Sequence, residues 1–440
     1  MEIFIKIVQL LLSLSILVLF HEFGHFIAAR IFKTRVEKFY LFFDPWFSLF
    51  KFKKGETEYG IGWIPLGGYV KISGMIDESM DKEQMKQPPQ PWEFRTKPAW
   101  QRLIIMLGGV TVNLLLAIAI YIVMLSAWGE QYLPTTQVKY GITVDSLGHQ
   151  MGLRNGDFIL SVDHKPVEDF SNIPKTIILE EAATIQVKRQ GQTVNVAIPT
   201  DFIGKLIKHK SPDFISVRFP FEAAKFTAGS PAEAAGMKTN DQIIGLNDSV
   251  TLFFDQFRAV IQQYKNKQVN VKVKRGADTL MLPVKVPAEG LIGVYPKGPA
   301  HYFTFKEKEY NIITAIPAGF VKAFDGAGNY LKSMKLLFSQ EKAYESVGGF
   351  ITIGSIFPST WDWQAFWSLT AFLSIMLAIL NVLPIPALDG GHVMFLFYEI
   401  VFRRKPSDKF MENAQIVGMI ILFGLLIFAN GQDILKLFRH

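Results

Sequence analysis

Long apolar runs dominate the pattern of hydrophobic and polar positions in this 440-residue chain. Three of them, at residues 3–20, 103–125 and 416–428 with its neighbours, approach or exceed the length of a membrane-spanning helix, which needs about 20 mostly apolar residues. A fourth run, residues 366–388, contains Asn381 and two prolines and predicts a broken helix. The pattern therefore predicts a polytopic α-helical membrane protein with four transmembrane helices.

The residues that flank these spans indicate whether the first one is cleaved and which side of the membrane each loop occupies. The first run has an alternative interpretation as a cleaved signal peptide, but it lacks a basic n-region and a small-x-small cleavage site, so we favour a spanning helix. Basic residues crowd the loop before the last span and the exit from the first span: Arg403, Arg404, Lys405, Lys409, Arg30, Lys33, Arg35 and Lys38. Because cytoplasmic loops carry the excess of Lys and Arg, this side is predicted to be cytoplasmic.

The spans divide the chain into consecutive segments. We expect span one at 1–30, a cytoplasmic-side segment at 31–100, span two at 101–128, two outer domains at 129–212 and 213–290, a linker with an interfacial helix at 291–363, span three at 364–400, a cytoplasmic loop at 401–413 and span four at 414–436. Residues 58–75, EYGIGWIPLGGYVKISGM, read as short β-strands broken by glycines. They predict a membrane-associated β-hairpin at about 57–76 that packs on the spanning helices, and a small cytoplasmic sheet fits the pattern equally well.

The long segment between the second and third spans repeats itself. Residues 152–163, GLRNGDFILSVD, align with residues 236–247, GMKTNDQIIGLN, at an offset of 84 residues. Each copy continues into a polar turn, a helix-like stretch and alternating strands, which predicts two tandem α+β domains. The shared element resembles PDZ domains, which bind an extended peptide as an added strand. Peptide binding and a steric cap over the membrane part both stay open, because a fold alone does not fix a function.

Composition narrows the function classes. Apolar residues make up 49% and charged residues only 19% of the chain, which favours a membrane protein over an ordinary soluble enzyme. The net charge of +7 comes from scattered Lys and Arg, so no nucleic-acid partner is predicted. Since the chain has no cysteine, any bound metal must be held by histidines and carboxylates.

The end of the first span carries the strongest chemical signal, Phe20-His21-Glu22-Phe23-Gly24-His25. On a helix, residues i and i+4 share a face, so His21 and His25 can direct ring nitrogens at one metal ion, with Glu22 beside it to activate a water. This pattern is typical of zinc hydrolases. An ionised acidic residue at the centre of a membrane helix costs about 2.5–3.5 kcal/mol, so the cluster indicates an interior site rather than histidines at a lipid interface.

An open catalytic zinc site needs a third protein ligand. Asp389 is the strongest candidate, because it is strongly polar and ends the apolar run Asn381-Val-Leu-Pro384-Ile-Pro386-Ala-Leu388. The prolines interrupt the helix, which suits a ligand presented from a broken helix. His392 is a competing candidate, because histidine is the commonest metal ligand. We favour Asp389 over His392, because a carboxylate at this position is harder to explain without a metal ion.

Together, these two motifs and the paired PDZ-like repeats resemble the site-2 protease family, over nearly the whole chain. The resemblance is strongest to the bacterial subgroup that carries tandem PDZ domains and regulates sigma-E. It implies an intramembrane metalloprotease with Zn²⁺ held by His21, His25 and Asp389, and with Glu22 as general base. It further implies that Asn381 supports substrate or transition state. The residues Gly67 and Gly68 would belong to the β-loop that engages the unwound substrate.

The resemblance also implies a partner and a location. The substrate would be a single-span membrane protein, an anti-sigma factor cut in a stress response after another protease has removed its outer domain, with signal-peptide remnants as a further class. The protein would lie in the bacterial inner membrane, in contact with lipid, with periplasmic PDZ-like domains and an active site toward the cytoplasm. Two other classes compete: a non-enzymatic scaffold that gathers partners through its PDZ copies, and an ion transporter, which the absence of an inverted repeat disfavours.

Overall fold

The computed structural model describes residues 1–65, 67–75, 87–209, 214–340 and 347–438. It divides into two compact units. The first unit consists of Met1–Gly129, Glu309–Lys335 and Tyr344–His440, and the second of Glu130–Lys308 and Leu336–Ala343. We describe each unit by itself.

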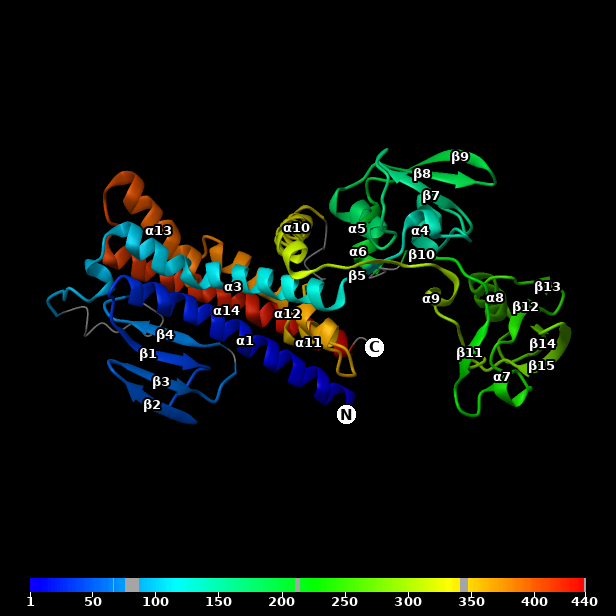
Figure 1. The fold of residues 1–440 in the computed structure, drawn as a ribbon, viewed down its shortest axis with the longest axis horizontal. Coiled ribbons are helices and arrows are strands. Elements are labelled where there is room, and N and C mark those ends of the chain that lie inside the picture. Colours follow the sequence, from blue (N-terminus) through cyan, green and yellow to red (C-terminus); the bar gives the residue numbers. More distant parts are fainter. Residues whose placement is uncertain (66, 76–86, 210–213, 341–346, 439–440) are drawn as a thin grey trace. The chain divides into compact units, whose positions relative to one another are not determined.

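The first unit is built on long apolar helices: α1 (Glu2–Ile31), α3 (Ala99–Trp128), α12 (Trp363–Val382) and α14 (Asp408–Phe438). Within the described residues, these four helices are long and apolar enough to cross a membrane. The prediction of a membrane protein with four spanning helices is confirmed at this level. Helix α3 packs against both α1 and α12, and Figure 1 shows these helices running side by side.

Helices α1 and α3 cross very closely at two glycines. A Cβ atom added to Gly24 would lie 2.2 Å from the carbonyl oxygen of Gly108, and one added to Gly108 would lie 2.5 Å from the carbonyl oxygen of Gly24. Small residues at a crossing let the backbones of membrane helices approach and pack. The crossing brings the end of α1, with its histidines, against the backbone of α3.

The third spanning segment differs from the predicted span over 364–400. Helix α12 ends at Val382, and a separate helix of 14 residues, α13 (Asp389–Phe402), begins after the prolines Pro384 and Pro386. Proline lacks the backbone N–H that a continuous helix requires. Ala387 in this break has a φ of 82°, in the left-handed region that a non-glycine residue adopts only under local constraint. The break places Asp389 at the start of α13.

A four-stranded sheet packs on α1. Its strands are β1 (Val36–Leu41), β2 (Phe50–Lys54), β3 (Thr57–Ile61) and β4 (Tyr69–Ile72), in the order β2-β3-β1-β4. The predicted hairpin over 57–76 is wrong, because β3 and β4 do not pair with each other. Strand β3 lies parallel and β4 antiparallel to β1, which separates them. Residues 66 and 76 of that prediction lie outside the described residues.

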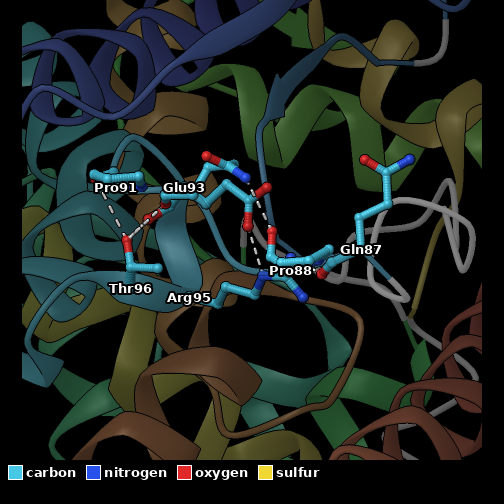
Figure 2. Close-up of polar contacts among 7 residues, drawn as sticks. Gln87, Pro88, Pro91, Glu93, Arg95 and Thr96 are labelled. Carbon is cyan, nitrogen blue, oxygen red and sulfur yellow. Dashed lines mark hydrogen bonds and ion pairs between the residues drawn. The ribbon is translucent and has the colours of Figure 1, made fainter.

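Residues 87–98, which precede α3, are held by local polar contacts, several of which Figure 2 shows. The hydroxyl of Thr96 donates to the carbonyl oxygen of Glu93 at 2.7 Å, and the guanidinium of Arg95 donates to the carbonyl oxygen of Gln87 at 2.9 Å. The amide of Phe94, in the short 3-10 helix η1 (Phe94–Thr96), donates to the carbonyl oxygen of Ser73. These contacts tie the start of α3 to the end of the sheet.

Two further helices complete the described part of the first unit. Helix α10 (Ile312–Ser339) begins in it, within the predicted linker, and its Ala323 and Ala327 pack with residues of α3 and α12. Helix α11 (Phe350–Ile356) contacts α1 and α14. The carboxylate of Asp433 on α14 accepts hydrogen bonds from the amides of Gly349 and Thr352 at the start of α11, both at 2.9 Å. These bonds satisfy backbone donors that a helix start leaves free.

The second unit has two apolar cores. The first involves β6 (Ile142–Val144), α4 (Ser146–Met151), β7 (Phe158–Val162), α5 (Asn172–Leu179), β8 (Thr184–Arg189), β9 (Gln192–Ala197), α6 (Phe202–His209) and β10 (Ile215–Val217). The second involves β11 (Ala223–Phe226), α7 (Pro231–Ala234), β12 (Gln242–Leu246), β13 (Ser249–Val250), α8 (Phe254–Ile261), β14 (Gln268–Arg275), β15 (Asp278–Lys285) and β16 (Val294–Pro296). Strands β5 (Glu130–Tyr132) and β17 (Lys306–Lys308) pair with each other, and α9 (Pro299–Tyr302) precedes β17.

The predicted boundary at residues 212 and 213 does not coincide with the division between these cores. Strand β10 pairs with β6, and its residues Ile215 and Val217 belong to the first core, as does Phe303 from the predicted linker. The second core begins at Phe221 and includes Ile292. The sequence repeat did not reveal this closing strand, because the repeated element covers only the middle of each copy.

The two copies of the sequence repeat contain the same set of hydrogen bonds between an arginine and an aspartate. In the first copy, Arg189 forms two hydrogen bonds to the buried carboxylate of Asp157, at 2.8 and 2.7 Å, and a third to the carbonyl oxygen of Gly152. In the second copy, Arg275 forms the same three bonds to Asp241 and to the carbonyl oxygen of residue 236. Paired Arg–carboxylate bonds of this kind are short and strongly directional.

Candidate metal centre and active site

The structure brings together three predicted site residues from distant parts of the chain. His21 and His25 stand one turn apart on α1, and Asp389 is the first residue of α13. The Nε2 atoms of both histidines lie 3.2 Å from Oδ2 of Asp389 and 3.3 Å from each other. All three side chains are at most 15% exposed. The two histidines therefore share one face of α1, as their spacing predicted, and the carboxylate of Asp389 lies opposite that face.

This donor set fits a zinc ion. Among the described residues, the buried Oδ2 of Asp389 has no hydrogen-bond partner, although two imidazole nitrogens lie 3.2 Å from it. Three converging lone pairs repel one another unless a cation lies between them. Metal–ligand bonds of about 2.0–2.1 Å at a tetrahedral angle place ligand atoms about 3.3 Å apart, which agrees with these separations. Two imidazoles and one carboxylate are also a known ligand set of catalytic zinc.

The second ring nitrogen of His25 has a backbone partner. Nδ1 lies 2.9 Å from the carbonyl oxygen of Ile105 on α3. Because a carbonyl only accepts, Nδ1 carries the hydrogen, and Nε2 is left with a lone pair directed at the cluster. Metal-binding histidines are usually fixed in this way by a hydrogen bond from the other nitrogen.

Both imidazoles lie against a glycine of α3 that the sequence analysis did not single out. A Cβ atom added to Gly109 would lie 2.5 Å from Nε2 of His25, 2.6 Å from Cε1 of His21 and 2.7 Å from Nδ1 of His21. Real Cβ contacts are longer than this, so a side chain at residue 109 would displace the rings. Two adjacent glycines in an apolar span were visible in the sequence, but their partner was not.

Glu22 lies between the histidines and the sheet. Val70 in β4 lines the same cavity as Glu22. A Cβ atom on Gly68 would lie 2.7 Å from the carbonyl oxygen of Tyr40 and 3.3 Å from Cγ of Glu22, so this glycine lets the strand approach α1. Gly67 beside it lies against the ring of Phe43. Both predicted glycines therefore line the cavity at this site, immediately before the edge strand β4 rather than in a hairpin.

Two asparagines face His21. Asn381, in the last turn of α12, has its amide nitrogen 3.2 Å from Nε2 of His21. Asn113, in the middle of α3, has its amide nitrogen 3.3 Å from Nδ1 of the same ring. Asn381 was predicted as a site residue, and its role in supporting the substrate or the transition state stays a prediction. The second was noted only as a polar interruption of an apolar span.

A cavity of about 650 Å³ opens beside these residues. Its lining includes His21, Glu22, Gly68, Asn381, Asp389 and His392. The volume lies within the range of small-ligand sites, about 300–1,000 Å³. His392 faces this cavity one turn beyond Asp389, but it is not part of the three-residue cluster. The geometry therefore favours Asp389 over His392 as the third ligand.

Comparison with known proteins identifies the family of the chain. The model of peptidase family M50 matches residues 9–425. Proteins named "Putative zinc metalloprotease" from Neisseria meningitidis and Xylella fastidiosa are 27% and 28% identical to the chain. The alignments cover 97% and 99% of the chain, and 98% and 99% of the relatives. A protein named "Regulator of sigma E protease" from Haemophilus influenzae is 28% identical over 97% of the chain and 98% of its own length.

These matches span the chain from the first helix to the last and include both ligand-bearing motifs. They confirm the predictions of a site-2 protease, of metalloprotease activity and of zinc as the cofactor. The assignment of individual residues stays a prediction that rests on the geometry above. By the extent of the family match, the chain belongs to peptidase family M50.

Proposed function

We propose that this protein hydrolyses a peptide bond in or near the transmembrane segment of a single-span membrane protein. His21, His25 and Asp389 would hold the zinc ion, and Glu22 would act as the general base. One observation carries the proposal. The Nε2 atoms of His21 and His25 on α1 and Oδ2 of Asp389 on α13 lie within 3.3 Å of one another, and the carboxylate of Glu22 lines the same cavity. Ionisable groups in membrane segments are rare and mark functional sites.

The chain's own groups divide the reaction between them. Bound zinc would supply Lewis-acid chemistry, which polarises a carbonyl and makes water nucleophilic near neutral pH. Glu22 accepts a proton from the attacking water, whose oxygen bonds to the peptide carbonyl carbon. The carbon–nitrogen bond then breaks as Glu22 returns the proton to the leaving amine. Asn381 can donate a hydrogen bond to the carbonyl oxygen as it gains negative charge.

Strand β4 supports a role in holding the substrate. A membrane helix hides its peptide bonds in its own hydrogen bonds, so it must unwind locally before cleavage. Strand β4 is an edge strand of its sheet and lines the cavity with Tyr69 and Val70. An edge strand can pair with an extended segment of another chain. The unwound substrate would add to β4 beside Glu22.

The proposal extends to substrate and location. The relative named regulator of sigma E protease supports an anti-sigma factor as substrate, cut after a first cleavage has removed its outer domain. We place the protein in the bacterial inner membrane with its active site toward the cytoplasm, because basic residues crowd the loops on that side. The repeated Asp–Arg contacts support two PDZ-like domains, which would lie in the periplasm.

Glu22→Gln tests the enzymatic proposal. The substitution keeps the size of the side chain and leaves the three proposed ligands unchanged, so the purified protein should retain zinc. Cleavage of a single-span substrate should fall at least about 100-fold, because the general base is lost. Unchanged cleavage would disprove the assignment of Glu22. Full biological function without any cleavage would instead support the non-enzymatic scaffold.

Asp389→Ala and His392→Ala form a matched pair for the third ligand. Both remove a polar side chain that faces the same cavity, from positions three residues apart on α13. We expect Asp389→Ala to lose bound zinc and His392→Ala to retain it, measured by metal analysis of the purified full-length chain. The opposite result would transfer the ligand role to His392.

A further inference from the structure

The buried side-chain amide of Asn113, in α3, lies next to Nδ1 of His21, the ring nitrogen that does not face Asp389. Asn113 has no exposed surface, and its Nδ2 lies 3.3 Å from Nδ1 of His21. Its Oδ1 atom is also buried and has no hydrogen-bond partner among the described residues. A polar group with an unpaired oxygen inside an apolar helix is unfavourable, so its position calls for a chemical reason.

The protonation pattern of His21 supplies that reason. If Nε2 of His21 offers a lone pair to a metal, the hydrogen of the neutral ring must be on Nδ1. This N–H then needs an acceptor, and an amide nitrogen is not one. Turning the Asn113 amide by 180° about its Cβ–Cγ bond exchanges its two ends, and oxygen and nitrogen positions in an amide are assigned from the surrounding hydrogen bonds. The oxygen then accepts from Nδ1, and the amide nitrogen takes the buried position in which the oxygen has no partner among the described residues.

We propose that Asn113 is a positioning residue, whose side-chain oxygen fixes the tautomer and ring orientation of His21. Helix α3 would then serve both histidines in the same way, with the carbonyl oxygen of Ile105 for His25 and Oδ1 of Asn113 for His21. The missing side chain of Gly109 between them leaves room for both rings. The inference rests on the proposed role of His21 as a ligand.

A purely structural role for Asn113 makes a different prediction. The hydroxyl of Ser374 on α12 donates to the backbone oxygen of Asn113 at 2.7 Å, and this bond joins α3 to α12. Such polar contacts between membrane helices contribute to packing. Because the bond uses the backbone of Asn113, a change of its side chain leaves the partner of Ser374 in place. The two roles can therefore be separated by substitution.

The test is zinc affinity of the full-length chain in detergent, measured by competition with a chelator. Asn113→Leu keeps the size of the side chain and removes the acceptor, so we expect affinity to fall about 10- to 100-fold. Asn113→Asp keeps an acceptor oxygen, and its affinity should stay within about threefold of the unchanged protein. Ser374→Ala removes the contact between helices and should also stay within about threefold.

Each other outcome overturns the inference. Asn113→Leu with unchanged zinc affinity would show that His21 does not need this acceptor. A loss in Asn113→Asp of tenfold or more would exclude the acceptor role, even if Asn113→Leu failed to fold. If Asn113→Leu and Ser374→Ala lost equal zinc affinity, the cause would be altered helix packing. Retention of zinc by His21→Ala would instead disprove the proposed metal centre itself, which keeps the two failures distinct.

Discussion

Gly109 and the two histidines share one small volume between α1 and α3. The rings of His21 and His25 occupy the space that a side chain at residue 109 would fill. Packed interiors respond to the addition of even one methyl group, because neighbouring atoms must shift or adopt strained rotamers. This position therefore controls the site without offering any atom that could bind a metal.

Gly109→Ala should damage the site through sterics alone. The added methyl group would press on both rings, and we expect a loss of about 1–3 kcal/mol in stability together with weaker zinc binding. Gly424→Ala on α14 is the matched control, because no atom of the described residues lies within 4 Å of its added Cβ atom. Zinc content and thermal unfolding in detergent would measure both effects. Zinc binding by Gly109→Ala equal to that of the control would contradict the packing argument.

The sequence predicted the histidines and Glu22 because their contacts depend on spacing along one helix. Asp389 was predicted because a carboxylate next to an apolar run needs a partner. The roles of Gly109 and Asn113 were not predicted, because they depend on where α3 crosses α1, and a single sequence does not reveal which face of one span meets another. A lone asparagine in an apolar span was the available signal.

At the scale of elements, the two copies in the second unit are each fixed by an Asp–Arg contact. The guanidinium of Arg275 on β14 bonds both carboxylate oxygens of Asp241 and also the carbonyl oxygen of Gly236. The amide of Lys238 donates to the same carboxylate. Burial would raise the pKa of Asp241, but these hydrogen bonds outweigh it and hold the pKa below its ordinary value. The carboxylate therefore stabilises the fold in its charged form.

Asp241→Asn should weaken the second copy in a pH-dependent way. Near neutral pH we expect a loss of about 1–3 kcal/mol, because the charged hydrogen bonds are replaced by weaker ones. The folded pKa lies below the unfolded value, so the stabilisation is present above about pH 4 and disappears as the pH falls further. Hydrogen exchange of the β12 and β14 amides in the full chain, at about pH 7 and about pH 3, would measure the difference.

The control for this prediction is Asp248→Asn, which changes an exposed carboxylate in the turn that follows β12. It should leave exchange nearly unchanged at both pH values. A loss in Asp241→Asn that is equally large in acid would exclude the charged form as its cause.

The elements were predictable to different degrees. The spanning helices follow from the length of apolar runs, since each must satisfy its own backbone in lipid. Of the two interpretations of residues 58–75, the hairpin was wrong and a small sheet is present, because β1 and β2 precede that glycine-rich stretch and β1 lies between its two strands. Parallel pairing of β1 with β3 is non-local, and alternation along a strand does not identify its partner.

At the scale of the whole molecule, the main segment of the second unit, residues 130–308, is an insertion whose ends meet. Strands β5 and β17 pair with Glu130 opposite Lys308, so the chain enters and leaves this segment at the same place, and the end of α10 also belongs to the unit. None of the proposed ligands belongs to it. The proposed ligands and the two repeated copies therefore lie in different units.

Replacement of residues 130–308 by a short glycine–serine linker should leave zinc binding intact. If the PDZ-like domains exclude substrates whose outer domains are still bulky, the shortened protein should cleave such intact substrates, which the full chain spares. Cleavage of a pre-trimmed substrate serves as the control for activity. Continued resistance of intact substrates, with the trimmed one still cleaved, would contradict the filter.

The proposed ligands lie far apart in the chain, two near its beginning and Asp389 at position 389 of 440. During synthesis, a ribosome must therefore translate most of the message before the last of them emerges, and a prematurely terminated product carries two histidines without their acidic counterpart. If Asp389 is the third ligand, such a fragment cannot complete the metal centre, and we expect interrupted translation to release no active peptidase into the bilayer.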